Sequence, residues 1–224
     1  MIGINIDGID TLSTYGLILC DDLEIGTPEA IAKFVEIPGA DGALDLTETL
    51  TGGINYGMRE ISFSLFAARD VIAGTQTPAT ETNFAEIRRR FAVAYLGKLV
   101  QLQTPDDTSR YYKGRLQMDA KSGFNSGTIP IIVQCQPWHY KNSVTTRRVS
   151  VSASDVLFTN EMMKTVPTFT VTTGGARVIH KGVTYNLQAG ENTFEGIVFG
   201  PGENRVSFAS VSDPITVSWQ EASI

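Results

Sequence analysis

The side chains in this chain that could do chemistry are scattered or point apart. Two carboxylates can act together in general acid–base catalysis when they converge on a substrate, but the pairs here are the adjacent residues Asp21-Asp22 and Asp106-Asp107. Neighbouring residues of a strand point to opposite faces, so both pairs predict turn or surface roles. His139 and His180 lack a metal-ligating partner at short spacing. We expect structural roles for both histidines and no bound metal.

Local signatures of nucleophilic catalysis and phosphate binding do not occur. The sequence has no Gly-x-Ser-x-Gly elbow, and Gly52-Gly53 is not followed by the Lys-Ser or Lys-Thr of a phosphate loop. Cys20 and Cys135 are far apart in strand-like contexts, which favours two buried thiols over a disulfide. We therefore expect no enzymatic activity, no catalytic residue and no cofactor.

One basic cluster, Arg88, Arg89 and Arg90, raises the question of nucleic-acid binding. A nucleic-acid-binding face needs a broad basic patch on a basic domain, whereas this chain has a pI near 5.0. We interpret the three arginines as a suspected contact between subunits.

Charge is unevenly distributed along the chain. Residues 1–60 hold 11 acidic and 2 basic side chains (−9), and residues 61–140 hold 6 acidic and 9 basic ones (+3). Residues 141–224 hold 7 of each, which completes the net charge of −6. An ordinary solvated surface could have this pattern. A subunit with one acidic and one basic side, packed head to tail into a closed ring, explains it as well.

Hydrophobic periodicity predicts a mainly β chain with one helix. Alternation such as that of Ile61, Phe63 and Leu65 is typical of half-buried antiparallel strands. The helix is expected at 81–97, with one apolar face, Thr80 or Thr82 as N-cap and Gly97 at its end. Its apolar face consists of Phe84, Ile87, Phe91 and Tyr95. Further strands are expected at 2–6, 15–19, 32–37, 43–46, 98–103, 111–118 and 128–136, with a loop at 67–80.

Residues 141–224 predict a second, small antiparallel β module, separate from a first domain at 1–140. Its turns are expected at Gly174-Gly175, Gly190, Gly200-Pro201-Gly202 and Asp213-Pro214, and 141–148 is the expected linker. No internal repeat is evident. The sequence also shows no apolar run long enough for a membrane span and no signal peptide at its start, so we expect folding in a cytosol.

Several segments in this order resemble the distal tail protein family of long-tailed bacteriophages. They are DGALDLTETLTGGINYGMREISFSLF at 41–66, the helix at 81–97, PWHY at 137–140, VPTFTV at 166–171, and the closing stretches YNLQAGENTF and FGPGENRVSFASVSDPITVSWQEASI. Together they cover nearly the whole chain.

The resemblance implies a structural protein of the virion. It implies a β-sandwich-like N-terminal belt domain, with helix and β-hairpin, that forms a hexameric ring, and a C-terminal antiparallel sandwich that is often galectin-like. The ring would join the tail tube protein to the tip or baseplate protein, and in some cases a receptor-binding protein, with DNA passing through its lumen. It would be assembled in the host cytoplasm and located at the tail tip, with no membrane contact. The 84 residues after Tyr140 are few for a galectin-like sandwich, so a trimmed sandwich or an OB-like barrel stays open.

In such a ring the charge map predicts two surfaces. Asp41, Asp45 and Glu48 are suspected to line an acidic lumen that repels DNA phosphates, and Arg88–Arg90 to meet the acidic side of the next subunit. Trp219 lacks the polar neighbours that hold a sugar and predicts packing. Two alternative functions stay open: a carbohydrate-binding module for host attachment, and a tail-tube or other baseplate ring subunit.

Overall fold

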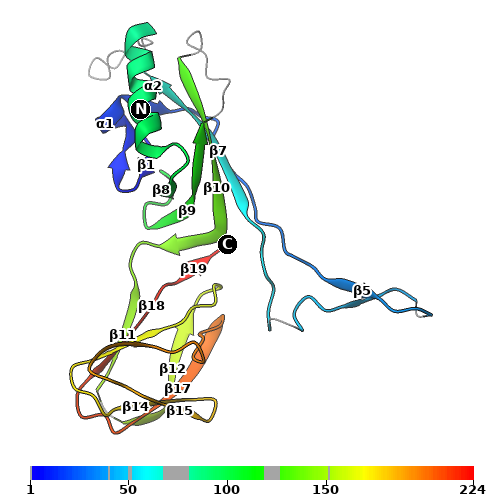
Figure 1. Cartoon of the computed structure of the whole chain (residues 1–224), viewed down its shortest axis with the longest axis vertical. Helices are drawn as coiled ribbons and strands as arrows, with labels where there is room; N and C mark the ends of the chain where they lie inside the picture. Colours follow the sequence, from blue (N-terminus) through cyan, green and yellow to red (C-terminus); the bar gives the residue numbers. More distant parts are fainter. Residues whose placement is uncertain (1, 40, 50–51, 68–80, 119–126, 151) are drawn as a thin grey trace. The chain divides into compact units, whose positions relative to one another are not determined.

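The computed structural model describes residues 2–39, 41–49, 52–67, 81–118, 127–150 and 152–224. It divides into two compact units, residues 1–137 and residues 138–224. Strands dominate both units (Figure 1), and the fold class expected from the sequence is confirmed.

The first unit is built on one antiparallel sheet curled into a half-barrel. Its strands follow the order β2-β1-β8-β9-β10-β7-β3, and β4 pairs with β7 beside β3. The strands are β1 (Asn5–Ile6), β2 (Ile9–Asp10), β3 (Leu17–Leu19), β4 (Glu24–Ile25), β7 (Arg59–Ala67), β8 (Leu99–Gln103), β9 (Arg110–Met118) and β10 (Thr128–Lys141), whose last four residues belong to the second unit. The alternation predicted for β7 is confirmed, since Ile61, Phe63 and Leu65 are buried.

Helix α2 (Glu81–Tyr95) lies against this sheet (Figure 1). Phe84, Phe91 and Tyr95 are buried in the same hydrophobic core as the sheet residues, and Ile87 packs against that core. Gly97 has a φ of +73°, the left-handed conformation expected of a residue that ends a helix. The apolar face predicted for this helix is therefore confirmed.

A second, short helix was not predicted. Helix α1 (Thr11–Tyr15) begins after Asp10, whose carboxylate accepts a hydrogen bond from the Ser13 amide at 2.8 Å, and ends at Gly16 with a φ of +67°. The apolar run predicted as a strand at 15–19 therefore splits into the end of α1 and strand β3. Likewise, the strand predicted at 2–6 is reduced to the two residues of β1.

Between β4 and β7 the chain forms a two-stranded hairpin. Strands β5 (Phe34–Glu36) and β6 (Ala43–Asp45) pair with each other in a sheet of their own. Backbone hydrogen bonds continue this ribbon toward β4 and β7, from the Ile31 amide to the Asn55 carbonyl and from the Gly57 amide to the Glu29 carbonyl, both 2.8 Å. We call residues 27–58 the arm.

The second unit is a sandwich of two four-stranded antiparallel sheets. One sheet has the order β11-β18-β13-β16 and the other β12-β17-β14-β15. The strands are β11 (Thr145–Val149), β12 (Ala153–Asn160), β13 (Thr168–Val171), β14 (Arg177–His180), β15 (Val183–Asn186), β16 (Gly190–Thr193), β17 (Gly202–Ala209) and β18 (Ile215–Trp219). The sandwich replaces the OB-like barrel that the sequence left open.

Two details of this unit differ from expectation. Residues 145–149 form strand β11, paired with β18, and so are part of the sandwich and not of a linker. Strand β19 (Ala222–Ser223) pairs with Tyr140 and His139 at the end of β10.

Trp219 is buried and stacks edge-on to Phe158 and Phe199 at 5.7 and 5.5 Å, so its predicted packing role is confirmed.

Candidate interaction surface

Of the groups considered for catalysis, Asp22, Asp107 and His180 make side-chain hydrogen bonds to the backbone. The carboxylate of Asp22 accepts the Ser64 amide at 2.9 Å, and that of Asp107 accepts the Ser109 amide at 2.9 Å. His180 is buried, with Nδ1 3.2 Å from the Arg205 carbonyl oxygen. His139 lies on β10, in register with Ser223 of β19.

The part of the chain that the structure describes contains no group of three or more His, Cys, Asp or Glu residues that could hold a metal ion. Within the same residues, neither helix is long and apolar enough to cross a membrane.

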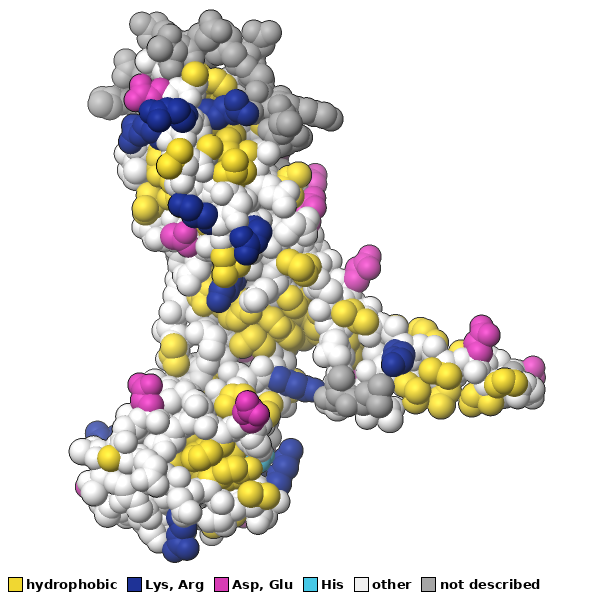
Figure 2. All heavy atoms as spheres, in the orientation of Figure 1, with side chains coloured by type: hydrophobic (Ala, Val, Ile, Leu, Met, Phe, Trp, Pro, Cys, Tyr) yellow, Lys and Arg dark blue, Asp and Glu magenta, His cyan; other side chains and the backbone are white. Residues whose placement is uncertain are grey.

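The arm carries an unusual amount of exposed apolar surface. Seven of its large hydrophobic side chains are between 40% and 63% exposed. They are Ile31, Phe34, Val35, Ile37, Leu44, Ile54 and Met58. Figure 2 shows hydrophobic side chains along this ribbon, with acidic groups among them. A two-stranded hairpin is marginally stable alone in water, so this surface is the kind that a partner covers.

Cross-strand register gives the arm two distinct faces. Val35 lies opposite Leu44, and directly opposed residues share a face, so this pair makes one side apolar. Phe34 lies opposite Asp45, and Glu36 lies opposite Ala43. Because strand residues alternate, these four belong to the other side, where one exposed aromatic ring sits among two carboxylates. We call this side the Phe34 face.

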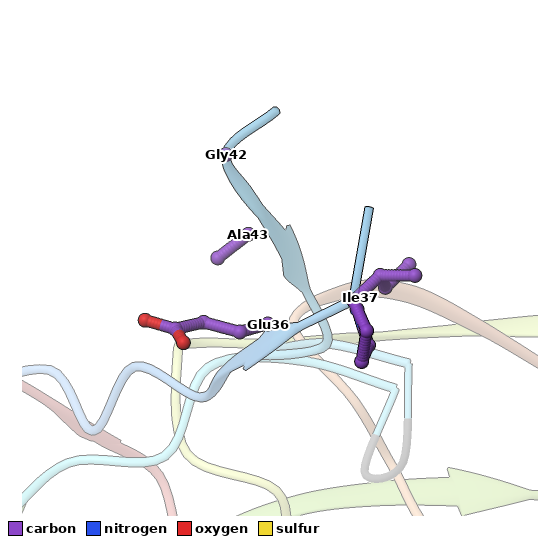
Figure 3. Close-up of a pocket in the computed structure, with 5 residues that line it drawn as sticks. Glu36, Ile37, Gly42 and Ala43 are labelled. Atoms are coloured by element: carbon purple, nitrogen blue, oxygen red, sulfur yellow. The ribbon is translucent and has the colours of Figure 1, made fainter. Parts of the chain in front are cut away.

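An open pocket of about 590 Å³ lies near the end of the hairpin, lined by Glu36, Ile37, Pro38, Gly42 and Ala43. Figure 3 shows the side chains of Glu36 and Ala43 pointing to one side of the ribbon and Ile37 to the other.

The arm is also acidic. Residues 27–58 hold five acidic side chains (Glu29, Glu36, Asp41, Asp45 and Glu48) and one basic one (Lys33), a balance of −4. Hydrogen bonds from Thr47 lower the pKa of Asp45, so this exposed group stays ionised in mildly acidic solution. The suspected lumen residues Asp41, Asp45 and Glu48 all lie exposed on the arm.

A second exposed apolar surface lies where helix α2 ends. Val93 is 71% exposed, Leu96 51% and Leu99 52%. The register of β8 and β9 places Leu99 opposite Arg115, whose guanidinium donates to the Gly97 carbonyl, and Lys98 Nζ donates to the Val93 carbonyl at 3.1 Å. We call Val93, Leu96 and Leu99, with Arg89, Lys98 and Arg115 around them, the helix-end patch. Basic and hydrophobic side chains are interspersed on the side of this unit shown in Figure 2.

The three arginines suspected of a subunit contact differ in exposure. Arg89 and Arg90 are exposed, but the Arg90 guanidinium lies over the Tyr15 ring at 5.8 Å from its centroid. Arg88 is half-buried, with its Nε enclosed. Arg89 is therefore the member of the triplet most open to a partner.

The sequence pointed to charged members of both surfaces, Asp45 and Arg89, but not to their exposed apolar residues. The segment AIAKFVEI signals the arm only weakly, through apolar residues at neighbouring positions that must lie on both faces of a strand. The apolar residues of the helix-end patch are close in the sequence, but the helical period does not single them out, because Leu99 belongs to the strand after the helix.

Comparison with solved structures identifies the class of fold: it is that of the distal tail hub proteins of bacteriophages. The chain superimposes on the crystal structure of SPP1 Dit (gp 19.1), described as a paradigm of the hub adsorption apparatus in phages that infect Gram-positive hosts, with a TM-score of 0.65 and 15% identity over 100% of both chains. No family model matches the chain, and no curated protein does. The resemblance found in the sequence is confirmed at the level of fold.

Proposed function

We propose that this protein is a structural subunit of a phage tail that assembles into a ring at its distal end. The observation that carries the proposal is the arm, an exposed apolar and acidic ribbon in a chain that has the distal tail hub fold. Both faces of this ribbon are exposed, so we expect a partner to cover it. Head-to-tail contacts between copies form a closed ring when the rotation from one copy to the next is a whole fraction of a full turn.

In this proposal the ring is hexameric and its neighbours are the tail tube protein and the tip protein. DNA passes through the lumen, and acidic side chains of the arm keep phosphates from adhering there. Asp41, Asp45 and Glu48 are the residues proposed to do so. The role is architectural, with no reaction to catalyse.

Native mass spectrometry and negative-stain imaging of the purified protein test the ring. A six-fold particle with a central hole is expected, and a wild-type protein that stays monomeric at high concentration contradicts the proposal. Replacing Phe34 by Ser should reduce assembly, because Phe34 is the most exposed large hydrophobic side chain among the described residues of the arm. Replacing Val144 and Val183 by Ser is the matched control, since both are 51–52% exposed and lie in the second unit.

A further inference from the structure

We propose that the Phe34 face of the arm binds the helix-end patch of a second copy of this chain. This rests on the proposed ring and names the two surfaces that meet in it. Among the described residues, Val93 and Phe34 are the two most exposed large hydrophobic side chains, at 71% and 63%.

The apolar centres of the two surfaces match in chemistry. Phe34 is a rigid aromatic side chain, the type enriched at the energetic centre of protein interfaces. On the helix-end patch Val93 lies in the last turn of α2, and Leu96, directly after the helix, continues that turn because its amide donates to the Ala92 carbonyl at 2.9 Å. Residues three apart in such a turn lie on the same side, which gives an exposed apolar surface for the Phe34 side chain. Burial of both removes apolar area from water that no other described contact covers.

The surrounding charges are complementary. Glu36 and Asp45 accompany Phe34 on the arm, and Arg89, Lys98 and Arg115 surround the patch. The segments as wholes have opposite signs, −4 for residues 27–58 and +3 for residues 81–118, which hold 7 basic and 4 acidic side chains. Lys98 uses one Nζ donor on the Val93 carbonyl, so its ammonium keeps further donors for a partner carboxylate. Complementary rims of this kind set register and orientation.

A second copy is the occupant that these observations favour. Both surfaces belong to the same chain, so every copy presents one arm and one patch, and the contact is heterologous, as a ring requires. This contact revises the proposed lumen: Asp45, opposite Phe34, lies at the subunit interface, and Asp41 and Glu48 remain as the proposed lumen residues.

Disulfide trapping tests the contact directly. The chain carries Cys20→Ser to remove the more accessible native thiol, together with Phe34→Cys and Val93→Cys. Oxidation of assembled protein should give a ladder of covalent dimers, trimers and larger species on a non-reducing gel. The matched control pairs Phe34→Cys with Val144→Cys, at an exposed valine of the second unit, and should give no ladder.

The outcomes separate the contact from the ring. If native mass spectra show rings but the Phe34→Cys, Val93→Cys variant gives no ladder, the contact is wrong and the ring is still supported. The contact is also wrong if the disulfide forms within one chain. A monomeric wild-type protein overturns both. Charge reversal gives a second readout: Glu36→Lys and Arg89→Glu should each weaken assembly about tenfold, and the double variant should recover most of it. If assembly does not recover in the double variant, Glu36 and Arg89 do not face each other in the contact.

Discussion

Gly114 on β9 lies directly against Cys135 on β10. A methyl group on Gly114 would be 2.5 Å from the Cys135 sulfur and 2.6 Å from the Gln134 carbonyl oxygen. Part of this obstacle is backbone, which cannot move aside as a flexible side chain can. The glycine therefore permits the close approach of the two strands at the centre of the first unit.

Gly114→Ala should accordingly lower the free energy of unfolding by about 1–3 kcal/mol, the usual cost of overpacking a core. Thermal or urea unfolding followed by circular dichroism measures it. Gly57→Ala is the matched control, because its new methyl would meet no atom nearer than the Glu29 carbonyl oxygen at 3.7 Å. Equal stability of the two variants contradicts the close approach.

Asn192 and Asn204 close equivalent turns, which we call the corners, in the two sheets of the second unit. Each follows a Gly-Glu pair, and the side-chain oxygen of each accepts the amide four residues earlier, Gln188 at 2.9 Å and Gly200 at 2.8 Å. The Nδ2 atoms donate to the Gly190 and Gly202 carbonyls, both at 3.1 Å, and also across to the neighbouring strand, at Phe169 and Phe158. The motif Gly-Glu-Asn thus recurs at 190–192 and 202–204 with the same bonds.

Asn204→Ala should cost about 1–3 kcal/mol of unfolding free energy, because partly buried backbone groups lose their partner. Asn192→Ala is expected to act in the same way on the other sheet. Asn186→Ala, at an exposed position of β15, is the control and should be nearly neutral. Loss of stability in the control alone would refute the role of the corners.

The sequence predicted the sheet and the helix well because their signals are local. The alternation of Ile61, Phe63 and Leu65 and the helical spacing of Phe84, Phe91 and Tyr95 arise from the period of a single element. Helix α1 has only five residues, too few for a period. It depends on distant partners: the Thr11 hydroxyl accepts the Ile4 amide at 3.0 Å and donates to the Leu17 carbonyl at 3.2 Å.

The apolar parts of the interaction surfaces could not be predicted in the same way. An apolar strand that is exposed, such as Phe34–Glu36, has the same composition as one that is buried. The helix-end patch is assembled by pairing Leu99 with Arg115, sixteen positions apart, which no local pattern contains. The triplet Gly-Glu-Asn occurs twice, at 190–192 and 202–204, but three residues are too few to count as an internal repeat, and their common role follows only from their hydrogen bonds.

The two thiols differ in their surroundings. Cys20 should react before Cys135, and ionisation of Cys135 should lower the free energy of unfolding at alkaline pH. Burial raises the pKa of Cys135 from 9.0 to about 12, and burial, with Asp22 and Asp21, raises that of Cys20. Unfolded cysteine ionises near 9.0 while folded Cys135 stays protonated, so its contribution to stability is complete below pH 9 and falls as the pH rises toward 12.

Labelling with a thiol reagent, followed by mass spectrometry, should therefore modify Cys20 before Cys135, because Cys135 is fully buried. Cys135→Ala should flatten the alkaline loss of stability relative to the wild type. Labelling of Cys135 as fast as Cys20 under native conditions contradicts this prediction.

Lys141 joins two carboxylates of the second unit. Its Nζ lies 2.6 Å from Glu221 Oε2 and 2.9 Å from Glu161 Oε1, and Thr145 Oγ1 also donates to Glu221 at 2.6 Å. Glu221 is buried, so removing the cation leaves an uncompensated buried charge, whereas Lys141 itself is partly solvated. Lys141→Met should therefore cost about 2 kcal/mol, between the values for exposed and buried pairs.

The stabilisation by Lys141 should also depend on pH. Hydrogen bonds to Glu221 and Glu161 raise the pKa of Lys141 above its ordinary 10.5. The stabilisation is complete below 10.5 and is lost as the pH rises through the higher folded value. Glu161→Gln should lose less stability than Lys141→Met, because it removes the more solvated carboxylate and leaves Glu221 paired. Urea unfolding of both variants across this pH range checks the order, and a larger loss for Glu161→Gln would show that Glu221 does not depend on the lysine.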